Sequence, residues 1–340
     1  MKNLSKWMLV AIGCSLIVSA NTDVSQSNVC GDPIALSPNH WQSVSPAVYG
    51  KNIVWIKDYQ QVIVFNSNGT SAITDANVIR EDPAIFENTI VWIEYNPDAQ
   101  VMMCDLSNNG YTGGCLENDT KTQVTSNISL KLKPKIGNNS IGWHEYDGQD
   151  FEIMICDRSR NGLSDGCLMH DKKIQLTENN GDDTNIDLTE RYVVWQIKRA
   201  ISRWNIVLHD RQTNKTKIFK EKHNQENPVI KQEHDKYQIV YWTNEEGNED
   251  SMLRTRQGKK KLLNSTYDEW NPIINKESSD IILWFSSKTD PPTIEGLKGN
   301  TRITMKTSGS KRINKLALFE NVLVFEATKQ GRSKIWMTKC

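Results

Sequence analysis

Two segments of the sequence carry oxygen side chains in a pattern that could bind a metal ion. One begins at Asp105 and contains Asn108, and the other begins at Asp157 and contains Asp165. Carboxylate and amide oxygens interleaved with glycine suit Ca²⁺, so these four residues are candidate calcium ligands. The alternative, which we favour, is a turn whose Asn-Gly pair adopts left-handed backbone conformations. No other cofactor is predicted.

A second candidate site consists of charged, amide and aromatic side chains that recur in short polar stretches. Such groups can bind a cation, a sugar or a basic peptide segment where a fold brings them together. The members of this set are His40, Trp41, Gln42, Glu81, Asp82, Asp182, Asp183, Glu226, Asp268, Glu269 and Trp270.

No linear catalytic motif accompanies these residues. The six histidines are scattered, and the sequence lacks the zinc-protease helix motif, the nucleophile elbow and the phosphate-binding loop. We therefore predict no catalytic residue and favour a protein that is not an enzyme. An enzyme that assembles its site from dispersed residues is the alternative.

A repeat of about 45 residues determines where all these stretches lie. A β-branched run that ends in an aromatic residue occurs seven times, and four short strands can be placed in most units. The seven aromatic residues are Trp55, Trp92, Trp143, Trp195, Trp242, Trp284 and Phe325. This pattern predicts an all-β fold, a seven-bladed β-propeller of four-stranded blades, with these aromatic residues packed between blades.

The two ends of the repeat region predict how the ring closes. The last unit ends after its third strand, whereas a strand-like segment, Pro33–Ser37, precedes the first complete unit. The N-terminal strand is therefore expected to join the C-terminal blade, which removes exposed sheet edges. We expect an N-terminal segment, 21–45, that contains this strand, and propeller repeats over 46–340 that form a single domain with 30–45.

The same repeat predicts how six of the seven cysteines pair. In two neighbouring units a Cys-x10-Cys pair flanks the loop between the third and fourth strands, and the closing blade places its two cysteines equivalently. A zinc site is disfavoured because no Cys-x-x-Cys spacing occurs. The predicted disulfides are Cys104–Cys115, Cys156–Cys167 and Cys30–Cys340.

The N-terminus and the charge balance restrict the location and the partners. Residues 7–20 form an apolar stretch after two lysines and end in Val18-Ser19-Ala20, which is typical of a signal peptide over 1–20. We predict export to the periplasm, the cell surface or the medium, without a membrane span. A lipid anchor on Cys14 is the less favoured alternative. The 41 basic and 41 acidic residues disfavour a nucleic-acid partner.

The repeat resembles that of Tol-type (TolB-like) exported propeller proteins. The resemblance rests on the order Pro83-Ala84-Ile85, Ile90-Val91-Trp92 and a closing Gln175-Leu176-Thr177, and it weakens in the last three units. It implies a propeller fold and export, but no particular activity. The separate domain that precedes the propeller in TolB is not found upstream of these repeats.

These observations combine into a functional hypothesis. Loops that lead into the first strand of each blade emerge on one face of a propeller, so the second candidate site is expected on that face. We predict an exported, monomeric binding or scaffold module that recognises a protein or a glycan there. The alternative is a secreted carbohydrate-active enzyme, a lyase or hydrolase, with its site at the channel mouth.

Overall fold

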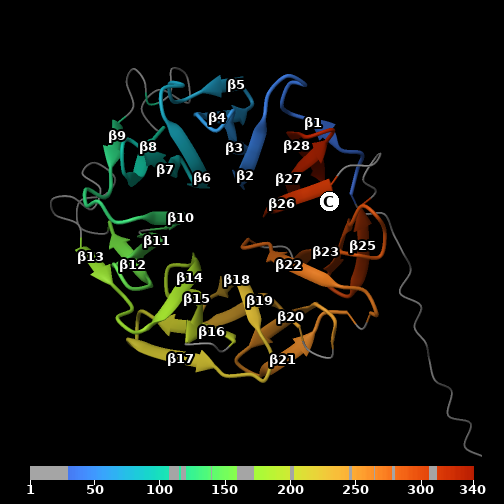
Figure 1. Ribbon diagram of the computed structural model, residues 1–340. Coiled ribbons are helices and arrows are strands. Elements are labelled where there is room, and N and C mark those ends of the chain that lie inside the picture. The colour runs from blue at the N-terminus through green and yellow to red at the C-terminus, as the bar shows by residue number, and fades with distance from the viewer. Residues whose placement is uncertain are drawn as a thin grey trace, which may run out of the picture.

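The computed structural model describes residues 30–106, 115, 120–138, 140–158, 172–199, 203–244, 247–263, 265–277, 280–305 and 312–340. These residues form seven four-stranded antiparallel sheets arranged in a ring around a central channel (Figure 1). The predicted seven-bladed β-propeller is confirmed. The described part of the chain contains no helix long and apolar enough to span a bilayer.

The blades are numbered 1 to 7 in the order of their first strands, which lie nearest the channel (Figure 1). The first strands are β2 (Ser43–Tyr49), β6 (Ile79–Phe86), β10 (Lys131–Gly137), β14 (Gly181–Leu188), β18 (Gln225–Glu233), β22 (Glu269–Ile274) and β26 (Arg312–Phe319). The second strands are β3 (Asn52–Lys57), β7 (Thr89–Tyr95), β11 (Ser140–Tyr146), β15 (Tyr192–Arg199), β19 (Lys236–Thr243), β23 (Ile281–Ser286) and β27 (Val322–Lys329).

The two outer strands of each blade complete the sheets. The third strands are β4 (Gln61–Asn66), β8 (Ala99–Asp105), β12 (Phe151–Asp157), β16 (Trp204–Asp210), β20 (Asp250–Thr255), β24 (Thr293–Lys298) and β28 (Arg332–Lys339). The fourth strands are β5 (Gly69–Ala72), β9 (Thr120–Gln123), β13 (Lys172–Gln175), β17 (Lys215–Phe219), β21 (Gly258–Lys261), β25 (Thr301–Met305) and β1 (Ile34–Ala35).

The short strand β1 closes the ring, as the sequence predicts. It pairs antiparallel with β28, so that Ile34 lies opposite Met337. The disulfide Cys30–Cys340 fixes the same edge of blade 7. In Figure 1 the blue N-terminal strand β1 accordingly lies beside the red strand β28.

Of the two disulfides predicted in other blades, only one has both cysteines among the described residues. Cys104–Cys115 is present, next to the third strand of blade 2. Cys156, at the corresponding position in blade 3, is disulfide-bonded. Cys167, its predicted partner, lies outside the described residues, so that pairing stays a prediction.

The repeated aromatic residues pack between neighbouring blades, as expected. Trp143 of blade 3 belongs to an apolar cluster that also contains Val91 and Val101 of blade 2. Such inter-blade contacts bury the faces that a single four-stranded sheet would leave exposed to water.

One aromatic assignment was wrong by one residue. In blade 3 the core Trp143 pairs with Met154, and in blade 5 the residue in that register is Tyr241, which pairs with Met252. Tyr241 is 1% exposed, whereas Trp242 is only partly buried. Two adjacent aromatic residues in this unit made its register ambiguous in the sequence.

Candidate functional site: the central cavity

Each first strand has an irregular register at the same place along the channel. The strand pairing skips between Val44 and Ala47 in blade 1, and equivalent shifts occur in the six other blades. A bulge of this kind redirects side chains and is often found next to functional sites. The residues that share this position are Ser45, Asp82, Lys133, Asn185, Asn227, Asn271 and Lys315. All of them except Lys315 have a positive φ, between 48° and 56°.

These seven residues form a set that we call the polar ring. Asn185 is at its centre, since its Oδ1 accepts a hydrogen bond from Lys133 Nζ at 2.7 Å and its Nδ2 donates one to Asn227 Oδ1 at 2.6 Å. Asn227 donates in turn to Asn271 Oδ1 at 2.7 Å. Lys315 lies 3.3 Å from Asp82. Polar contacts thus connect blades 3 to 6, and also blades 7 and 2, at one level of the channel.

A cavity of about 620 Å³ lies between the polar ring and the turns that join first to second strands. All seven first strands contribute to its wall. Its volume is within the usual range for small-molecule sites, roughly 300–1,000 Å³. We call the side with these turns, which include Lys51 and Glu87, the turn face.

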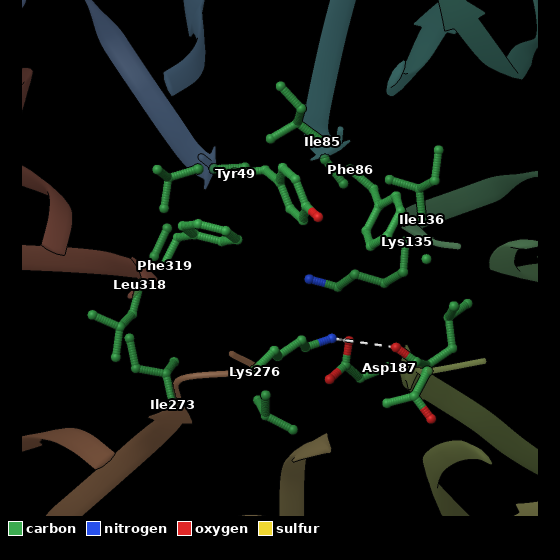
Figure 2. Close-up of a pocket in the computed structure, with 18 of the residues that line it drawn as sticks. Tyr49, Ile85, Phe86, Lys135, Ile136, Asp187, Ile273, Lys276, Leu318 and Phe319 are labelled. Atoms are coloured by element: carbon green, nitrogen blue, oxygen red, sulfur yellow. Dashed lines mark hydrogen bonds and ion pairs between the residues drawn. The ribbon is translucent and has the colours of Figure 1, made fainter. Parts of the chain in front are cut away.

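One side of the cavity is aromatic. The ring centroid of Tyr49 lies 4.7 Å from that of Phe86 and 4.6 Å from that of Phe319. These residues end the first strands of blades 1, 2 and 7, and the Tyr49 hydroxyl points into the cavity (Figure 2). Burial and the carboxylates Glu277 and Glu87 raise the pKa of Tyr49, so its hydroxyl stays protonated and can donate a hydrogen bond.

The other side is charged, and most of its charge is paired within the protein. Lys276 Nζ lies 2.6 Å from Asp187 Oδ1 and 3.3 Å from the carbonyl oxygen of Leu188. The second oxygen of Asp187 accepts a hydrogen bond from the Ile230 backbone amide at 2.9 Å. Because both carboxylate oxygens of Asp187 are occupied, its charge is satisfied inside the protein.

Lys135 differs from these charged groups because its ammonium lacks such a partner. Its side chain extends from β10 towards the middle of the cavity (Figure 2). No hydrogen bond or ion pair links its Nζ to another described residue. The pKa of Lys135 is lowered to about 8, chiefly by burial; Lys315 and Lys276 contribute to the lowering, and Asp187 and Asp82 oppose it. The site therefore offers one cation to an acceptor that the protein does not supply.

The structure does not bring the second candidate site together as predicted. Seven of its members lie within first strands rather than in the loops before them, because these strands begin earlier than the sequence suggested. They are Glu81, Asp82, Asp182, Asp183, Glu226, Glu269 and Trp270. Of the whole set, only Asp82 lines the cavity. The cavity extends to the turn face, whereas the predicted face is the opposite one.

The two tryptophans of that set have structural contacts. Trp41 packs against an apolar cluster at the junction of blades 7 and 1, and Lys57 Nζ lies 4.5 Å from its ring centroid. The ring of Trp270 lies 5.8 Å from that of Phe285 and borders another cluster. Both tryptophans are therefore only partly exposed.

The remaining members have diverse surroundings. Gln42 accepts a hydrogen bond from the Ser333 amide, which ties blade 1 to blade 7, while His40 and Asp268 are exposed. Glu226 is half-buried next to Glu249, which together with burial raises its pKa. Glu81 accepts a hydrogen bond from the Tyr95 hydroxyl at 3.1 Å.

Two carboxyl groups of this set are completely buried. Asp183 accepts hydrogen bonds from Trp195 Nε1 and Asn179 Nδ2, and burial raises its pKa to about 7. Burial likewise raises the pKa of Glu269, which accepts a hydrogen bond from Ser265 at 2.8 Å, to about 7. Both groups connect a first strand to neighbouring segments.

The predicted calcium ligands are only partly described. Asp105 ends β8 and Asp157 ends β12, where Arg211 lies 3.6 Å from the Asp157 carboxylate. Asn108 and Asp165 lie outside the described residues, so a calcium site in these loops stays a prediction.

Among the described residues, the histidines do not meet a carboxylate in an ion pair. His144 is buried beside Phe151, with ring centroids 5.3 Å apart. Burial, together with Lys133, lowers its pKa to about 3, so the imidazole is neutral at physiological pH.

The sequence contained one signal for the cavity that its analysis missed. Lys135 follows Pro134 in a repeat where the same position is Ala47 or Ala84 in other blades. A lysine that replaces a small residue beside the channel indicates a ligand contact more specifically than polar loops do. Tyr49, Phe86 and Phe319 gave no such signal, because aromatic residues at strand ends are common.

No protein-family model matches the chain, and no curated protein matches it in sequence. Solved structures resemble its fold at low identity. A puromycin-hydrolysing peptidase of Mycobacterium tuberculosis matches with a TM-score of 0.64 and 7% identity, over 92% of this chain and 56% of that one. A prolyl endopeptidase is matched over 50% of its length and a puromycin hydrolase over 53%, so the chain spans about half of these peptidases.

Two other structures are matched over nearly their whole length. The propeller domain of the Trilobed protease from Pyrococcus furiosus, described as having an open velcro topology, matches with a TM-score of 0.62 and 8% identity, over 90% of this chain and 94% of that one. An oligogalacturonate lyase in complex with manganese matches with a TM-score of 0.60 and 9% identity, over 93% and 95%. These likenesses show that the chain has the fold of β-propeller domains.

Proposed function

We propose that this protein is an exported binding module whose ligand enters the central cavity from the turn face. The observation that carries the proposal is the Lys135 ammonium, which reaches into the cavity without a partner among the described residues. A partly buried cation is less well solvated than an exposed one, and a ligand that supplies an acceptor offsets this loss. The cavity is therefore shaped for recognition by charge as well as by size.

The two sides of the cavity suggest the chemistry of the ligand. An acidic group would reach Lys135, while an apolar or ring-shaped part would pack on Tyr49, Phe86 and Phe319. An acidic sugar or the carboxylate end of a peptide with an aromatic side chain has both features. The ligand thus stays within the classes that the sequence predicted, a protein or a glycan.

Export is supported by the disulfides rather than by the fold. Cys30–Cys340 and Cys104–Cys115 are expected to persist in an oxidising compartment. The predicted signal peptide and the resemblance to Tol-type exported propellers agree with this location.

Matched ligand pairs test the binding proposal. The probes are N-acetylphenylalanine against its uncharged amide, and tri-galacturonate against neutral galactotriose, titrated by calorimetry. We expect the acidic member of at least one pair to bind at least 10-fold more tightly. Lys135→Met should abolish that preference, whereas Lys51→Met, which removes an exposed lysine of the turn face, should preserve it. The proposal would be contradicted if acidic and neutral probes bound equally well. It would also be contradicted if Lys135→Met bound the acidic probe as tightly as the unchanged protein does.

The match to oligogalacturonate lyase gives a second candidate, a lyase that acts on acidic oligosaccharides. That enzyme is covered almost completely by this chain, unlike the peptidases, which extend well beyond it. The test is incubation with oligogalacturonate and Mn²⁺, followed by detection of unsaturated products. If product forms and Lys135→Met does not reduce its amount, the reaction takes place outside the cavity. Absence of product would leave the binding module as the better account.

A further inference from the structure

A cluster of three carboxylates lies on the side of the ring opposite the turn face, at the turn between β11 and β12 and the start of β12. Asp147, Asp150 and Glu152 each place a carboxylate oxygen there, and these oxygens all lie within 4.8 Å of one another. Two oxygens bound to one Ca²⁺ at about 2.4 Å can be at most about 4.8 Å apart. The three carboxylates are therefore close enough to share a single ion.

Two of these carboxylates are buried, and three of their four oxygens lack a hydrogen-bond partner among the described residues. Asp150 is 8% exposed, and neither of its oxygens has a hydrogen-bond partner among the described residues. Glu152 is 1% exposed, with Oε2 likewise unpartnered and Oε1 bonded to the Asn179 amide at 2.9 Å. Buried polar groups are nearly always satisfied, so three unpartnered oxygens in one turn require an explanation.

The charge around these residues is negative. Burial, Asp147 and Asp182 raise the pKa of Asp150, while burial and the nearby carboxylates raise that of Glu152. None of the ion pairs found in the described ranges involves Asp147, Asp150 or Glu152. Compensation from a bound cation would remove a repulsion that the protein does not itself relieve.

Asp147 forms the exposed side of this cluster. Asp147 is exposed, and its Oδ1 accepts hydrogen bonds from the backbone amides of Gln149 and Asp150, at 2.8 and 3.2 Å. This arrangement fixes the carboxylate in place and leaves its other oxygen available. Asp182, at the start of β14 in blade 4, accepts a hydrogen bond from the Phe151 amide at 3.4 Å and closes the inner side.

We propose that Asp147, Asp150 and Glu152 bind a hard divalent cation, and that Ca²⁺ is the preferred ion. The donors are all carboxylate oxygens, without the nitrogen or sulfur that zinc and copper favour. Ca²⁺ accepts such ligands with flexible geometry and completes its shell with water. The ion would tie the β11–β12 turn to the start of β12 and stabilise this end of blade 3.

Calorimetric titration of chelator-treated protein with Ca²⁺, Mg²⁺ and Zn²⁺ tests this proposal. We expect a Ca²⁺ site that Asp150→Asn removes, so that the measured stoichiometry falls by one. Asp98→Asn, in the corresponding turn between β7 and β8, is the matched control and should keep the site. Because the stoichiometry is compared between variants, calcium bound near Asn108 or Asp165 would not obscure the result.

Thermal unfolding separates loss of binding from loss of folding. Ca²⁺ should raise the melting temperature of the unchanged protein but not that of Asp150→Asn. In chelator, Asp150→Asn should melt no lower than the unchanged protein, because it removes an uncompensated buried charge. The exposed Asp147→Asn should fold normally and weaken Ca²⁺ binding at least 10-fold. Unchanged stoichiometry in Asp150→Asn, or absence of Ca²⁺ binding by the unchanged protein, would overturn the proposal.

Discussion

At the scale of single residues, two ion pairs balance opposite charges in the channel. Asp187 is balanced by Lys276, and Asp82 by Lys315, at 2.6 and 3.3 Å. Lys135 is the exception among the described lysines that line the cavity, since Lys133 also has a partner in Asn185. Under the proposed function, its ammonium would give the cavity a preference for acidic ligands.

The pH dependence of stability should reveal Lys135 directly. Its pKa is about 8 in the folded protein and near 10.5 when exposed, so the unfolded chain holds more protons between these values. The free energy of unfolding should therefore rise from pH 8 to 10.5, and this contribution should be absent below pH 8. Urea unfolding of the unchanged protein and Lys135→Met across this range measures the difference. Parallel pH profiles would show that Lys135 is not desolvated.

Ligand binding should have the opposite pH dependence. Deprotonation removes the charge of Lys135, so the affinity for an acidic probe should fall as the pH rises through about 8. Asp187, Asp82, Lys276 and Lys315 face the same cavity and are common to all variants. Calorimetry at pH 7 and 9 with the acidic and amide probes provides the comparison. An affinity for the acidic probe that does not change between these pH values would argue against a role of Lys135 in binding.

At the scale of strands, the bulges shape the site. In blades 1 to 6 the bulge places one residue of the first strand in a left-handed conformation, and Asn tolerates this better than most residues do. In blades 4, 5 and 6 the residue is asparagine, and the three side chains bond to one another. Backbone conformation and side-chain hydrogen bonding therefore favour the same residue type at this position.

Two substitutions of Asn227 should separate these contributions. Asn227→Gly keeps the positive φ of 51° but loses the bonds to Asn185 and Asn271. Asn227→Ala loses the same bonds and adds the cost of a left-handed backbone, about 1–2 kcal/mol. Urea unfolding should therefore show Asn227→Ala as the less stable variant by about 1 kcal/mol. Equal stabilities would mean that the bulge relaxes when the side chain is removed.

The register of blade 5 makes a prediction about its two adjacent aromatic residues. Tyr241 occupies the inter-blade core position, so Tyr241→Ala should cost about 3 kcal/mol or more of unfolding free energy. Trp242→Ala should cost less, because its side chain is only partly buried. If Trp242→Ala were the more costly substitution in a denaturant titration, Trp242 would be the core residue, as the repeat predicted.

The second strands could be predicted from the sequence, whereas the cavity could not. The difference has a physical reason. Inter-blade packing requires a large apolar residue at the same point of every second strand, and this requirement appears in the sequence as a period. The channel imposes no such requirement, so Ala47, Lys135 and Asp187 can occupy equivalent positions. Residues without a common pattern, such as Tyr49 and Lys276, become a site only when the strands are placed in space.

At the scale of the whole molecule, the two ends of the repeat region close the ring of blades. Strand β1 has two residues, Ile34 and Ala35, and their side chains are exposed, so its apolar burial contributes little to holding it. Its pairing with β28 is supported by the backbone bond from Leu36 to Ile335 and by the disulfide at Cys30. The repeat predicted both the strand pairing and the disulfide from the sequence, because the last unit lacked only its fourth strand.

The two described disulfides should differ in their effect on stability. Cys30–Cys340 closes a loop of 310 residues and Cys104–Cys115 one of 11. In the chain-entropy model these are worth about 6 and about 3 kcal/mol, respectively. Replacing each pair by alanine should thus lower the urea midpoint more for Cys30–Cys340. A larger loss for Cys104–Cys115 would mean that the closure contributes less than its loop length predicts.

The differences among equivalent channel residues have one more consequence. Identical blades would give the cavity seven-fold rotational symmetry, and such a site could fix only how deeply a ligand enters. In this protein the equivalent positions are Ala47, Ala84, Lys135, Asp187, Val229, Ile273 and Ala317, so no rotation of the ring superimposes the site on itself. An asymmetric ligand would therefore bind in a single orientation about the channel axis, and changes at these positions could turn it without altering the inter-blade core.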